Sequence, residues 1–284
     1  MATPVVALVV DGAYYDVAAL ESAWSLPAVV EDNGFHARVL AARCAGLHEL
    51  DARLRTGIRP TEARLLPGEY LPLAPCDPDR AAYLQMAPYD LASEVPAFQA
   101  RDSRSLVGDQ QPVAFPTGAQ QPHFEAGLAV VLADDLWRAT APEAGRAILG
   151  YTLLIDWTPS PDPWSAQPCG PSPPSQLGPE LLVGAEAQAI SRAAAQVIIG
   201  GVVCDAGPVG AWRFRPAEAL AYLSQHQPLR AGDVVGTGCL VGGRAPIAGQ
   251  VLAFGDRSQV TLPGKLTLTG WAVPGPALGA WRLG

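Results

Sequence analysis

Hydrophobic and polar positions divide the chain into short apolar runs, and two of these runs lie next to acidic residues. Residues 128–132 form one apolar run, with Glu125 shortly before it, and residues 151–155 form another, with Asp156 directly after it. Such short runs, bounded by polar residues, are typical of buried strands. A carboxylate that ends a buried strand lies at the rim of a core, where it can meet a ligand. The same pattern also fits two ordinary acids at strand ends.

The first part of the chain predicts a hairpin followed by helix. Two apolar runs within residues 4–20 are joined by Asp11-Gly12, a dipeptide that favours the positive φ angles of a tight turn. Residues 26–54 carry apolar positions three and four apart, which predicts one or two helices interrupted near Asn33-Gly34. We therefore expect residues 1–60 to form a small α+β cap.

The remainder of the chain, residues 61–284, predicts mostly strands with a few short helices. Short strands are expected at 62–66 and within 99–122, and helices at 77–87, 142–147 with Thr140 as N-cap, and 216–224 with proline in the first turn. Residues 186–196 have helical propensity, but apolar runs around Gly200-Gly201 favour strand pairing there. Eight prolines between positions 159 and 179 predict an extended loop without helix or central strand. The expected fold class is α+β, mainly β.

Composition restricts the classes of function. The chain has 284 residues, of which 49% are hydrophobic and 16% charged, as in a soluble globular protein. Nineteen basic against 27 acidic residues, without a basic cluster, argue against nucleic acid or an anionic membrane as a partner. The apolar run at residues 5–10 is too short for a secretory signal or a spanning helix, so a cytoplasmic location is expected.

Residue types that are rare in the chain exclude several chemistries. Five cysteines without CxxC spacing predict free thiols and no structural zinc. Lys265 is the single lysine and Asn33 the single asparagine, so no mechanism can use either residue type elsewhere. The chain has no Walker, G-x-S-x-G or HExxH motif, and its glycines at 236–242 do not fit a dinucleotide fingerprint. Among four scattered histidines, His123 alone lies near a candidate acid, two residues before Glu125.

The last third of the chain carries a recognisable order of residues: Leu229, Gly232, Asp233, Val234, Thr237 and Gly238, followed by Gly255 and Asp256. This order resembles the closing signature of the fumarylacetoacetate hydrolase (FAH) superfamily. Residues 105–116 and 123–133 resemble the strand–turn–strand and the acidic motif of that family, and residues 6–20 resemble its small N-terminal region. The resemblance implies an FAH-type mixed β-sandwich roll for residues 61–284, usually homodimeric, and metal-assisted chemistry on small 2-oxo and 1,3-diketo acids.

Carried over residue by residue, the resemblance gives an incomplete metal site. The first glutamate of the family's Glu-x-Glu pair falls on Glu125 and its later aspartate on Asp156, but the second glutamate falls on Gly127. The family's lysine falls near Cys169, and its lid tyrosine falls on Tyr89 without the histidine that follows. Two carboxylates bind Mg²⁺ more weakly than three. We therefore expect no cofactor, with a divalent metal such as Mg²⁺ on Glu125 and Asp156 as the minor alternative, for which Asp90 or Asp162 could supply a further ligand.

Three functions remain open. The first is a divergent enzyme that dehydrates, isomerises or cyclises an oxo or enol small molecule in bacterial specialised metabolism, without metal. Asp156 and Glu125 then act as the acid–base pair, His123, Tyr151 or Tyr89 assist, and Cys169 is a weaker nucleophile. The substrate pocket is expected to include Gly127, Trp157, Trp164, Thr237 and Gly238. The second function is an inactive pseudoenzyme that serves as a binding or scaffold protein, and the third is a metal-dependent hydrolase or decarboxylase.

Overall fold

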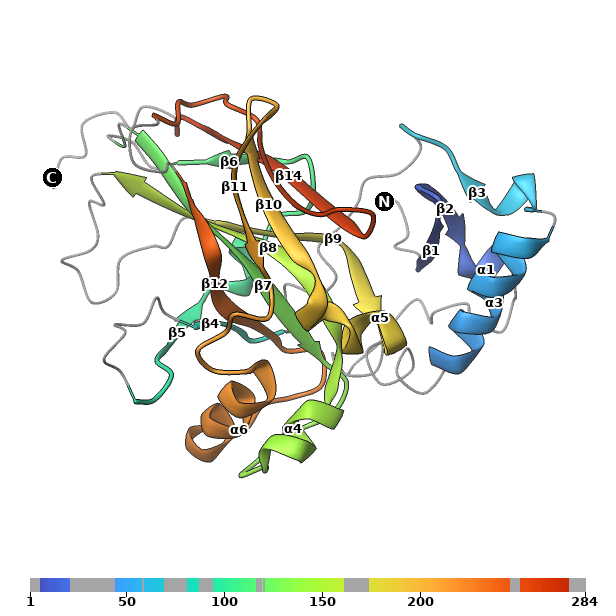
Figure 1. Ribbon diagram of the computed structural model, residues 1–284, viewed down its shortest axis with the longest axis horizontal. Helices are drawn as coiled ribbons and strands as arrows, with labels where there is room; N and C mark the ends of the chain where they lie inside the picture. Colours follow the sequence, from blue (N-terminus) through green and yellow to red (C-terminus); the bar gives the residue numbers. More distant parts are fainter. Residues whose placement is uncertain are drawn as a thin grey trace, which may run out of the picture.

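The computed structural model describes residues 6–20, 44–57, 59–68, 81–86, 94–115, 119, 121–160, 174–245 and 251–275. Within these ranges the protein consists of three sheets and a few short helices, which confirms the α+β, mainly β fold class (Figure 1).

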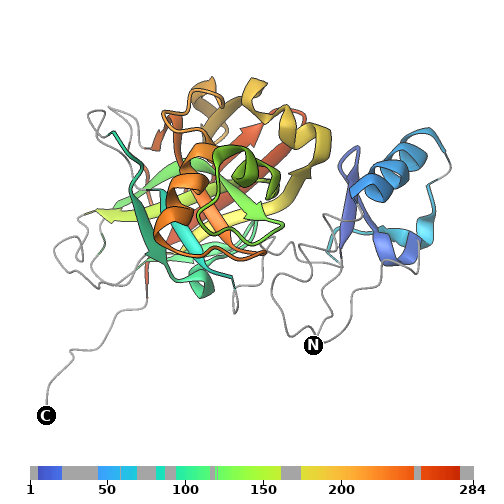
Figure 2. The same cartoon turned by 90° about the horizontal axis from the view of Figure 1, so that it is seen from below.

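The N-terminal elements form a small sheet with helices. Strands β1 (Ala7–Val10), β2 (Ala13–Asp16) and β3 (Arg64–Leu65) pair in the order β1-β2-β3. Asp11 and Gly12 have φ angles of 51° and 74°, so the predicted hairpin turn is confirmed. Helices α1 (Val17–Leu20) and α3 (Cys44–Thr56) and the 3₁₀ turn Thr61–Ala63 complete the unit, which lies beside the larger sheets in Figures 1 and 2.

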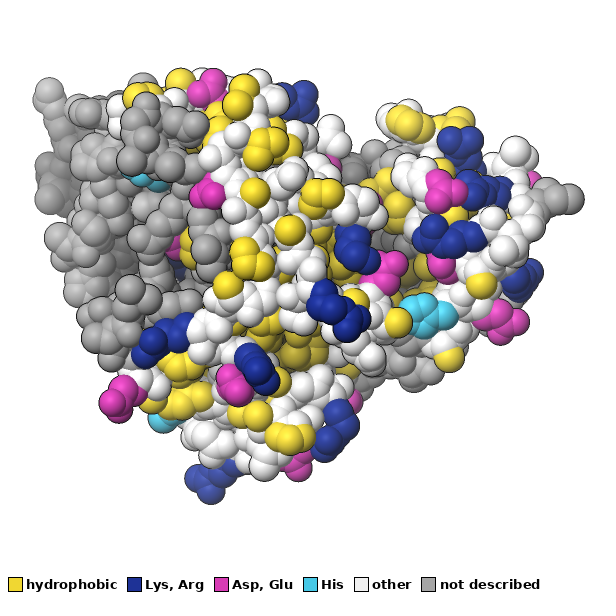
Figure 3. Space-filling model, viewed as in Figure 1, with side chains coloured by type: hydrophobic (Ala, Val, Ile, Leu, Met, Phe, Trp, Pro, Cys, Tyr) yellow, Lys and Arg dark blue, Asp and Glu magenta, His cyan; other side chains and the backbone are white. Residues whose placement is uncertain are grey.

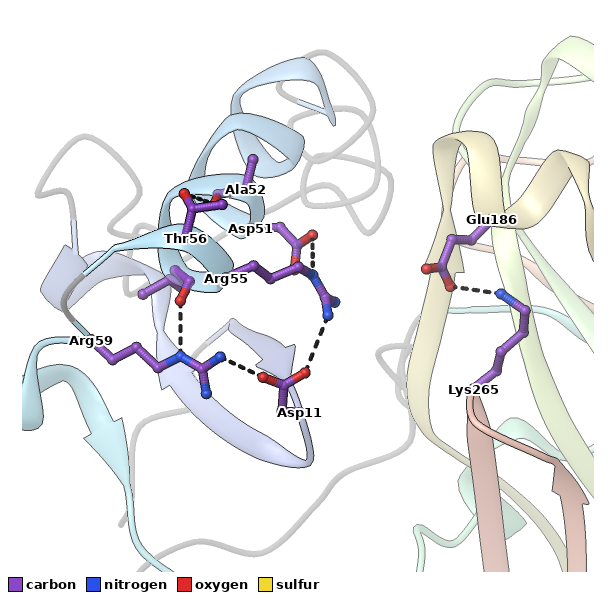
Figure 4. A network of polar contacts seen from close by, with 9 residues as sticks. Asp11, Asp51, Ala52, Arg55, Thr56, Arg59, Glu186 and Lys265 are labelled. Atoms are coloured by element: carbon purple, nitrogen blue, oxygen red, sulfur yellow. Dashed lines mark hydrogen bonds and ion pairs between the residues drawn. The ribbon is translucent and has the colours of Figure 1, made fainter.

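Charged contacts connect the hairpin turn to helix α3. Asp11 pairs with Arg59 and with Arg55, whose Nη1 lies 3.4 Å from Oδ1 of Asp11, and Nε of Arg55 donates to Asp51 at 2.9 Å (Figure 4). Contacts also join this unit to the rest of the protein. Tyr14 Oη donates to Oε1 of Glu180 at 2.7 Å, and the side chain of His48 in α3 lies against Gly184. The third strand of the small sheet lies beyond residue 60, so the chain returns to this unit after α3.

The large sheet has six strands in the order β5-β4-β12-β7-β8-β9. Its members are β4 (Tyr83–Met86), β5 (Phe98–Arg101), β7 (Gln121–Leu132), β8 (Ile148–Ser160), β9 (Ser175–Val183) and β12 (Val234–Ala245). All neighbours are antiparallel except β12 and β4. The two long strands expected around 128–132 and 151–155 are thus β7 and β8, paired along their lengths.

A five-stranded sheet packs against one side of β7 and β8. It has the order β11-β10-β13-β14-β6, with β6 (Pro112–Ala114), β10 (Ala194–Ile199), β11 (Val202–Pro208), β13 (Ser258–Leu262) and β14 (Leu266–Val273). Apolar residues of both sheets form the largest core cluster, which includes Phe124, Trp157, Val197 and Leu268. Burial of this apolar surface is the main term that holds the two sheets together.

Two helices cover one end of the large sheet. Helices α4 (Ala141–Arg146) and α6 (Pro216–His226) lie side by side at this end in both ribbon views (Figures 1 and 2). Apolar residues of the two helices pack on Leu84, Val130, Leu132 and Val235. Glu143 Oε2 accepts from the backbone N–H of Thr140 at 2.8 Å, which places Thr140 at the predicted N-cap of α4. Both helices were expected within two residues of where they lie. The remaining short elements are α5 (Gly184–Gln188) and two 3₁₀ turns, Ser103–Ser105 and Ile190–Arg192.

Two local predictions from the sequence are wrong. Tyr83–Met86, expected at the end of a helix over 77–87, is strand β4, because all four residues are buried between β5 and β12. Within residues 186–196, the end of α5 and a 3₁₀ turn are followed by the start of β10, which pairs with β11 around Gly200-Gly201, so the expected strand pairing there is confirmed. The proline-rich segment begins and ends in strands, since β8 includes Pro159 and β9 includes Pro179. Pro179 is tolerated because the pairing of β8 with β9 skips residues there.

None of the described helices is long and apolar enough to cross a membrane. Among the described residues on the face drawn in Figure 3, basic and acidic side chains are interspersed and form no extended patch of one sign.

Candidate functional site

The register between β7 and β8 decides which side chains share a face. Glu125 pairs with Asp156, His123 with Thr158, and Gly127 with Leu154. Because alternate residues of a strand point to opposite faces, these three pairs lie on one face of the sheet and their neighbours lie on the other. The two candidate acids are therefore direct cross-strand neighbours, although 31 positions separate them in the sequence (156 − 125).

The large sheet closes on itself into a roll. Val107, which follows β5 after a short turn, bridges to Gln176 of β9. Its N–H donates to the carbonyl of Ser175 at 2.9 Å, and its carbonyl accepts from the N–H of Leu177 at 3.0 Å. The edge that begins at β5 is thereby joined to the edge at β9, and one face of the sheet becomes the inside of the roll. Tyr83, Ala129, Leu154, Leu177 and Val234 form the apolar core inside it.

Closure of the roll brings Arg101 to Asp156. Arg101 is the last residue of β5, and its Nη2 donates to Oδ2 of Asp156 at 2.8 Å. Ser175, the cross-strand neighbour of Asp156 on β9, donates its hydroxyl to Oδ1 at 2.8 Å. The side chains of Arg101 and Asp156 are 15% and 7% exposed. Both carboxyl oxygens of Asp156 are thus held inside the roll by side chains from two other strands.

Burial shifts the pKa of Asp156. Loss of hydration raises the pKa of its carboxyl above the usual value of 3.8, while the charge of Arg101 and the hydrogen bonds from Ser175 and Arg101 oppose the rise. A carboxyl group that keeps its proton closer to neutral pH can both donate and accept a proton during a reaction. Asp156 is therefore the residue of the predicted set whose surroundings best suit proton transfer.

Glu125 and His123 lie on the same face as Asp156, toward the start of β7. Both side chains are half-buried, in contrast to the fully buried Phe124 between them. In the backbone register between β7 and β12, Glu125 lies opposite Arg244. The structure thus brings together Asp156, Glu125 and His123 of the predicted catalytic residues.

Gly127, Thr237 and Gly238 meet at a bulge between β7 and β12. The register shifts between Gly236 and Cys239, which leaves one extra residue on β12, and Gly238 has a φ of 85°. Thr237 Oγ1 donates to the carbonyl of Leu128 at 3.0 Å. A Cβ placed on Gly127 would lie 2.7 Å from the carbonyl oxygen of Gly238. These three predicted pocket residues hold the two strands close together, and no side chain fits at position 127.

Tyr151 and Trp157 lie on the other face of β8, away from Asp156. Trp157 is 1% exposed, stands edge-on to Phe115, and donates Nε1 to Oε1 of Gln176 at 2.9 Å. Tyr151 stacks on Trp212, and burial raises its pKa to about 12. Both were expected at the pocket, and the structure instead places them in the packing between the two sheets. The reason is the two-residue alternation of a strand, since both positions differ from 156 by an odd number.

The other predicted site residues lie outside the described part of the chain. They are Tyr89, Trp164 and Cys169, together with Asp90 and Asp162 as substitute metal ligands. Two residues of the site were not predicted at all, namely Arg101 and Ser175. Ser175 lies in the proline-rich segment, which was expected to be a loop, and Arg101 reaches Asp156 from a strand that is not its neighbour in the sheet. No periodic signal in the sequence marks either contact.

The described residues do not fit the three-carboxylate metal site that the resemblance implies. Position 127 offers neither a ligand nor room for one, and Asp156 already receives a guanidinium on one oxygen and a hydroxyl on the other. Within the described ranges, no three His, Cys, Asp or Glu side chains are grouped as metal ligands would be. A divalent cation prefers several oxygen ligands with carboxylates to balance its charge. At Asp156 a positive charge is instead supplied by Arg101.

Comparisons with known proteins give a family and a fold. The model of the family described as "Fumarylacetoacetate (FAA) hydrolase C-terminal" matches residues 75–271. An uncharacterized protein from Archaeoglobus fulgidus is 28% identical over 155 residues, which is 52% of this chain and 60% of that protein. The chain therefore matches less than two thirds of this relative's length.

Two solved structures share the fold over most of the chain. A 5-carboxymethyl-2-hydroxymuconate delta-isomerase from Mycobacterium smegmatis has a TM-score of 0.62 at 24% identity, covering 76% of this chain and 82% of the other. A maleylpyruvate hydrolase from Sphingobium sp. SYK-6, in complex with manganese(II) and pyruvate, has a TM-score of 0.69 at 17% identity, covering 96% and 97%. At these identities the likeness establishes the fold alone.

Proposed function

Because the chain belongs to the fumarylacetoacetate hydrolase family, we propose that it is an enzyme that acts on an oxo or enol small molecule by carboxylate acid–base chemistry. The proposal does not require a divalent metal. The observation that carries it is Asp156, whose side chain is 7% exposed inside the roll, fixed on both oxygens by Arg101 and Ser175 and directly opposite Glu125.

The chemistry needs only a proton that moves between two positions. One carboxylate removes a proton from the carbon beside a carbonyl, and a carboxylic acid returns a proton to another carbon or to the oxygen. No further reactant is consumed in such an isomerisation, and a dehydration differs only in that a hydroxyl leaves as water. Positioned acid–base groups typically contribute about 10²–10⁴-fold to a rate. We assign Asp156 as the main acid–base group, Glu125 as its partner and His123 as an assisting side chain.

The family supports this class of reaction. Solved relatives include the isomerase from Mycobacterium smegmatis, a 2-hydroxyhepta-2,4-diene-1,7-dioate isomerase from Mycobacterium marinum and the maleylpyruvate hydrolase from Sphingobium. Isomerisation of an enol or oxo acid fits the described site better than hydrolysis, because it uses no metal-bound water. We also propose that the protein forms a homodimer. Analytical ultracentrifugation of the purified protein measures its oligomeric state.

A metal-dependent hydrolase or decarboxylase is the second candidate function. The single observation that favours it is the manganese(II) ion in the Sphingobium maleylpyruvate hydrolase, a protein of the same fold. Metal analysis of the purified protein separates the two candidates. One equivalent of Mg²⁺, Mn²⁺ or Ca²⁺, with activity lost in EDTA and restored by the metal, supports the hydrolase and contradicts the metal-independent proposal.

The acid–base assignment is tested by replacing each carboxylate with its amide. Asp156→Asn and Glu125→Gln are assayed against the compounds named for the solved relatives, with Asp134→Asn, an exposed aspartate, as the matched control. We expect Asp156→Asn to lower kcat by about 10²-fold or more, Glu125→Gln by less, and the control to match the wild type. Wild-type turnover by Asp156→Asn contradicts the assignment. A wild-type protein that binds these compounds without converting any of them supports the pseudoenzyme instead.

A further inference from the structure

The guanidinium of Arg101 is only partly used by the protein. Its Nη2 donates to Asp156, but its Nε is buried and has no hydrogen-bond partner within the described part of the chain. A buried donor without an acceptor destabilises a fold, and native proteins keep few of them. Exposed arginines of this chain can turn to water, which Nε of Arg101 cannot do because it lies inside the roll.

The geometry of a guanidinium fixes where a missing acceptor would lie. Nε–H and one N–H of Nη2 lie along the same edge of the planar group and point in nearly the same direction. An oxygen that accepts from Nε therefore lies beside the carboxyl of Asp156. This is the position that a reacting carbonyl, enolate or carboxylate oxygen needs if Asp156 is to exchange a proton with the same molecule.

The guanidinium of Arg101 is the group at this position that attracts an anionic oxygen. Arg101 contributes the positive charge, while Asp156 and its cross-strand neighbour Glu125 are the acids of the site and His123 lies two residues along β7. Charge-assisted hydrogen bonds between a guanidinium and an oxyanion are among the strong ones, and they strengthen away from bulk water. A substrate oxygen that gains negative charge during the reaction is thus stabilised there.

We propose that Arg101 is a substrate-binding residue that receives an anionic oxygen on its Nε and supplies the positive charge for which related sites use a divalent metal. The ligand class is a small acid with a carboxylate or enolate oxygen. This inference rests on the proposed function, since it names what binds beside Asp156. It assigns to Arg101 two tasks at once, namely holding the Asp156 carboxyl and holding the ligand.

Binding of two small acids, oxalate and pyruvate, tests the proposal without a known substrate. Isothermal titration is carried out in EDTA with the full-length wild type, Arg101→Met, Arg101→Lys and Arg104→Met. Arg104 is the matched control, because it also lies shortly before the Val107–Gln176 bridge, but its side chain is 73% exposed and pairs with Asp102. We expect the wild type and Arg104→Met to bind alike, and Arg101→Met to bind at least about tenfold more weakly, as one charge-assisted hydrogen bond is lost.

Arg101→Lys keeps the fold measurable if Arg101→Met does not fold, since it keeps the charge beside Asp156. A lysine has no second donor held in one plane with the first, as a guanidinium has. We therefore expect the affinity of Arg101→Lys for the two acids to lie between that of the wild type and that of Arg101→Met. Free guanidinium added to Arg101→Ala is expected to restore part of the binding, which a purely structural role of Arg101 does not predict.

Three results would overturn the inference. They are equal affinities of the wild type and both the methionine and lysine variants, no binding of either acid by the wild type in EDTA, and binding that appears only when Mn²⁺ or Mg²⁺ is added. The test is independent of the acid–base assignment. If Asp156→Asn has wild-type turnover while Arg101→Met no longer binds oxalate, the acid–base assignment is contradicted and the anion-binding role of Arg101 is supported.

Discussion

Asp156 and Trp157 are adjacent residues of β8, and their side chains enter two different environments. Asp156 points into the roll, where Arg101 and Ser175 surround it with polar groups. Trp157 points between the two sheets, where Phe115 and Phe124 surround it with apolar rings. Strand β8 therefore carries the candidate acid–base residue on one face and contributes to the main apolar core on the other. Changes on the two faces should therefore affect different measurable properties.

The largest effect is expected on the outer face, from Trp157→Ala. Removing a buried tryptophan should lower the free energy of unfolding by about 3–5 kcal/mol, since a cavity forms. The change also leaves Oε1 of Gln176 without its donor. Denaturant titration measures it, with Trp137→Ala as the control. Trp137 is 53% exposed and lies against Arg138, so its loss should cost less than about 1 kcal/mol. Equal losses for the two variants would contradict the placement of Trp157 in the core.

A smaller loss is expected where β7 and β12 approach each other, from Gly127→Ala. The added Cβ meets the Gly238 carbonyl, a backbone atom that cannot turn away, so the free energy of unfolding should fall by about 1–3 kcal/mol. The matched control is Gly145→Ala in helix α4, where the Cβ would lie 3.5 Å from that of Ala217. That change should raise stability by about 0.5–1 kcal/mol. A stable Gly127→Ala protein would reopen position 127 to a metal-ligating side chain.

The two faces of β8 can also be compared through the pH dependence of stability. Because burial raises the pKa of Asp156, folding takes up a proton between 3.8 and the folded pKa. The contribution of this group to stability is therefore fully present below 3.8 and decreases as the pH rises through the folded pKa. We expect the difference in unfolding free energy between the wild type and Asp156→Asn to follow this course in denaturant titrations at several pH values.

The surface ion pair of Asp11 serves as a control of opposite sign. A hydrogen bond from Arg59 and then its charge lower the pKa of Asp11. Its contribution to stability is therefore present above 3.8 and is lost as the pH falls through the folded pKa. The difference between the wild type and Asp11→Asn should change in the direction opposite to that of Asp156→Asn. The same sign for both pairs would contradict the buried environment of Asp156.

The smallest effect is expected from deleting one hydroxyl on each face. Ser175→Ala removes a hydrogen bond to Asp156, so activity should change by about fivefold, the equivalent of about 1 kcal/mol. Tyr151→Phe acts on the outer face, and a phenol with a pKa of about 12 is a poor proton acceptor at neutral pH, so its activity should stay within about twofold of the wild type. An activity loss larger for Tyr151→Phe than for Ser175→Ala would reverse the assignment of the two faces.

Local signals in the sequence were sufficient for several elements, among them the two strands that carry Glu125 and Asp156. The Asp11-Gly12 turn, the helix after Thr140, the helix that starts at Pro216 and the two long strands all lie where capping, turn and periodicity patterns indicate. The same two-residue alternation could have separated Trp157 and Tyr151 from Asp156, because those positions differ by odd numbers from 156. The wrong prediction of a helix at Tyr83–Met86 has a different cause. There, burial between two distant strands overrides a local helix signal.

By itself, the sequence determined the family signature, the fold class and the choice of Glu125 and Asp156 as the two candidate acids. Only the tertiary structure decided that Arg101 meets Asp156, because β5 and β8 are separated by three strands within the sheet and come together only when the roll closes at Val107. Contacts across a closed sheet depend on curvature and register, which no single segment encodes. The charge that balances Asp156 is therefore a property of the whole roll.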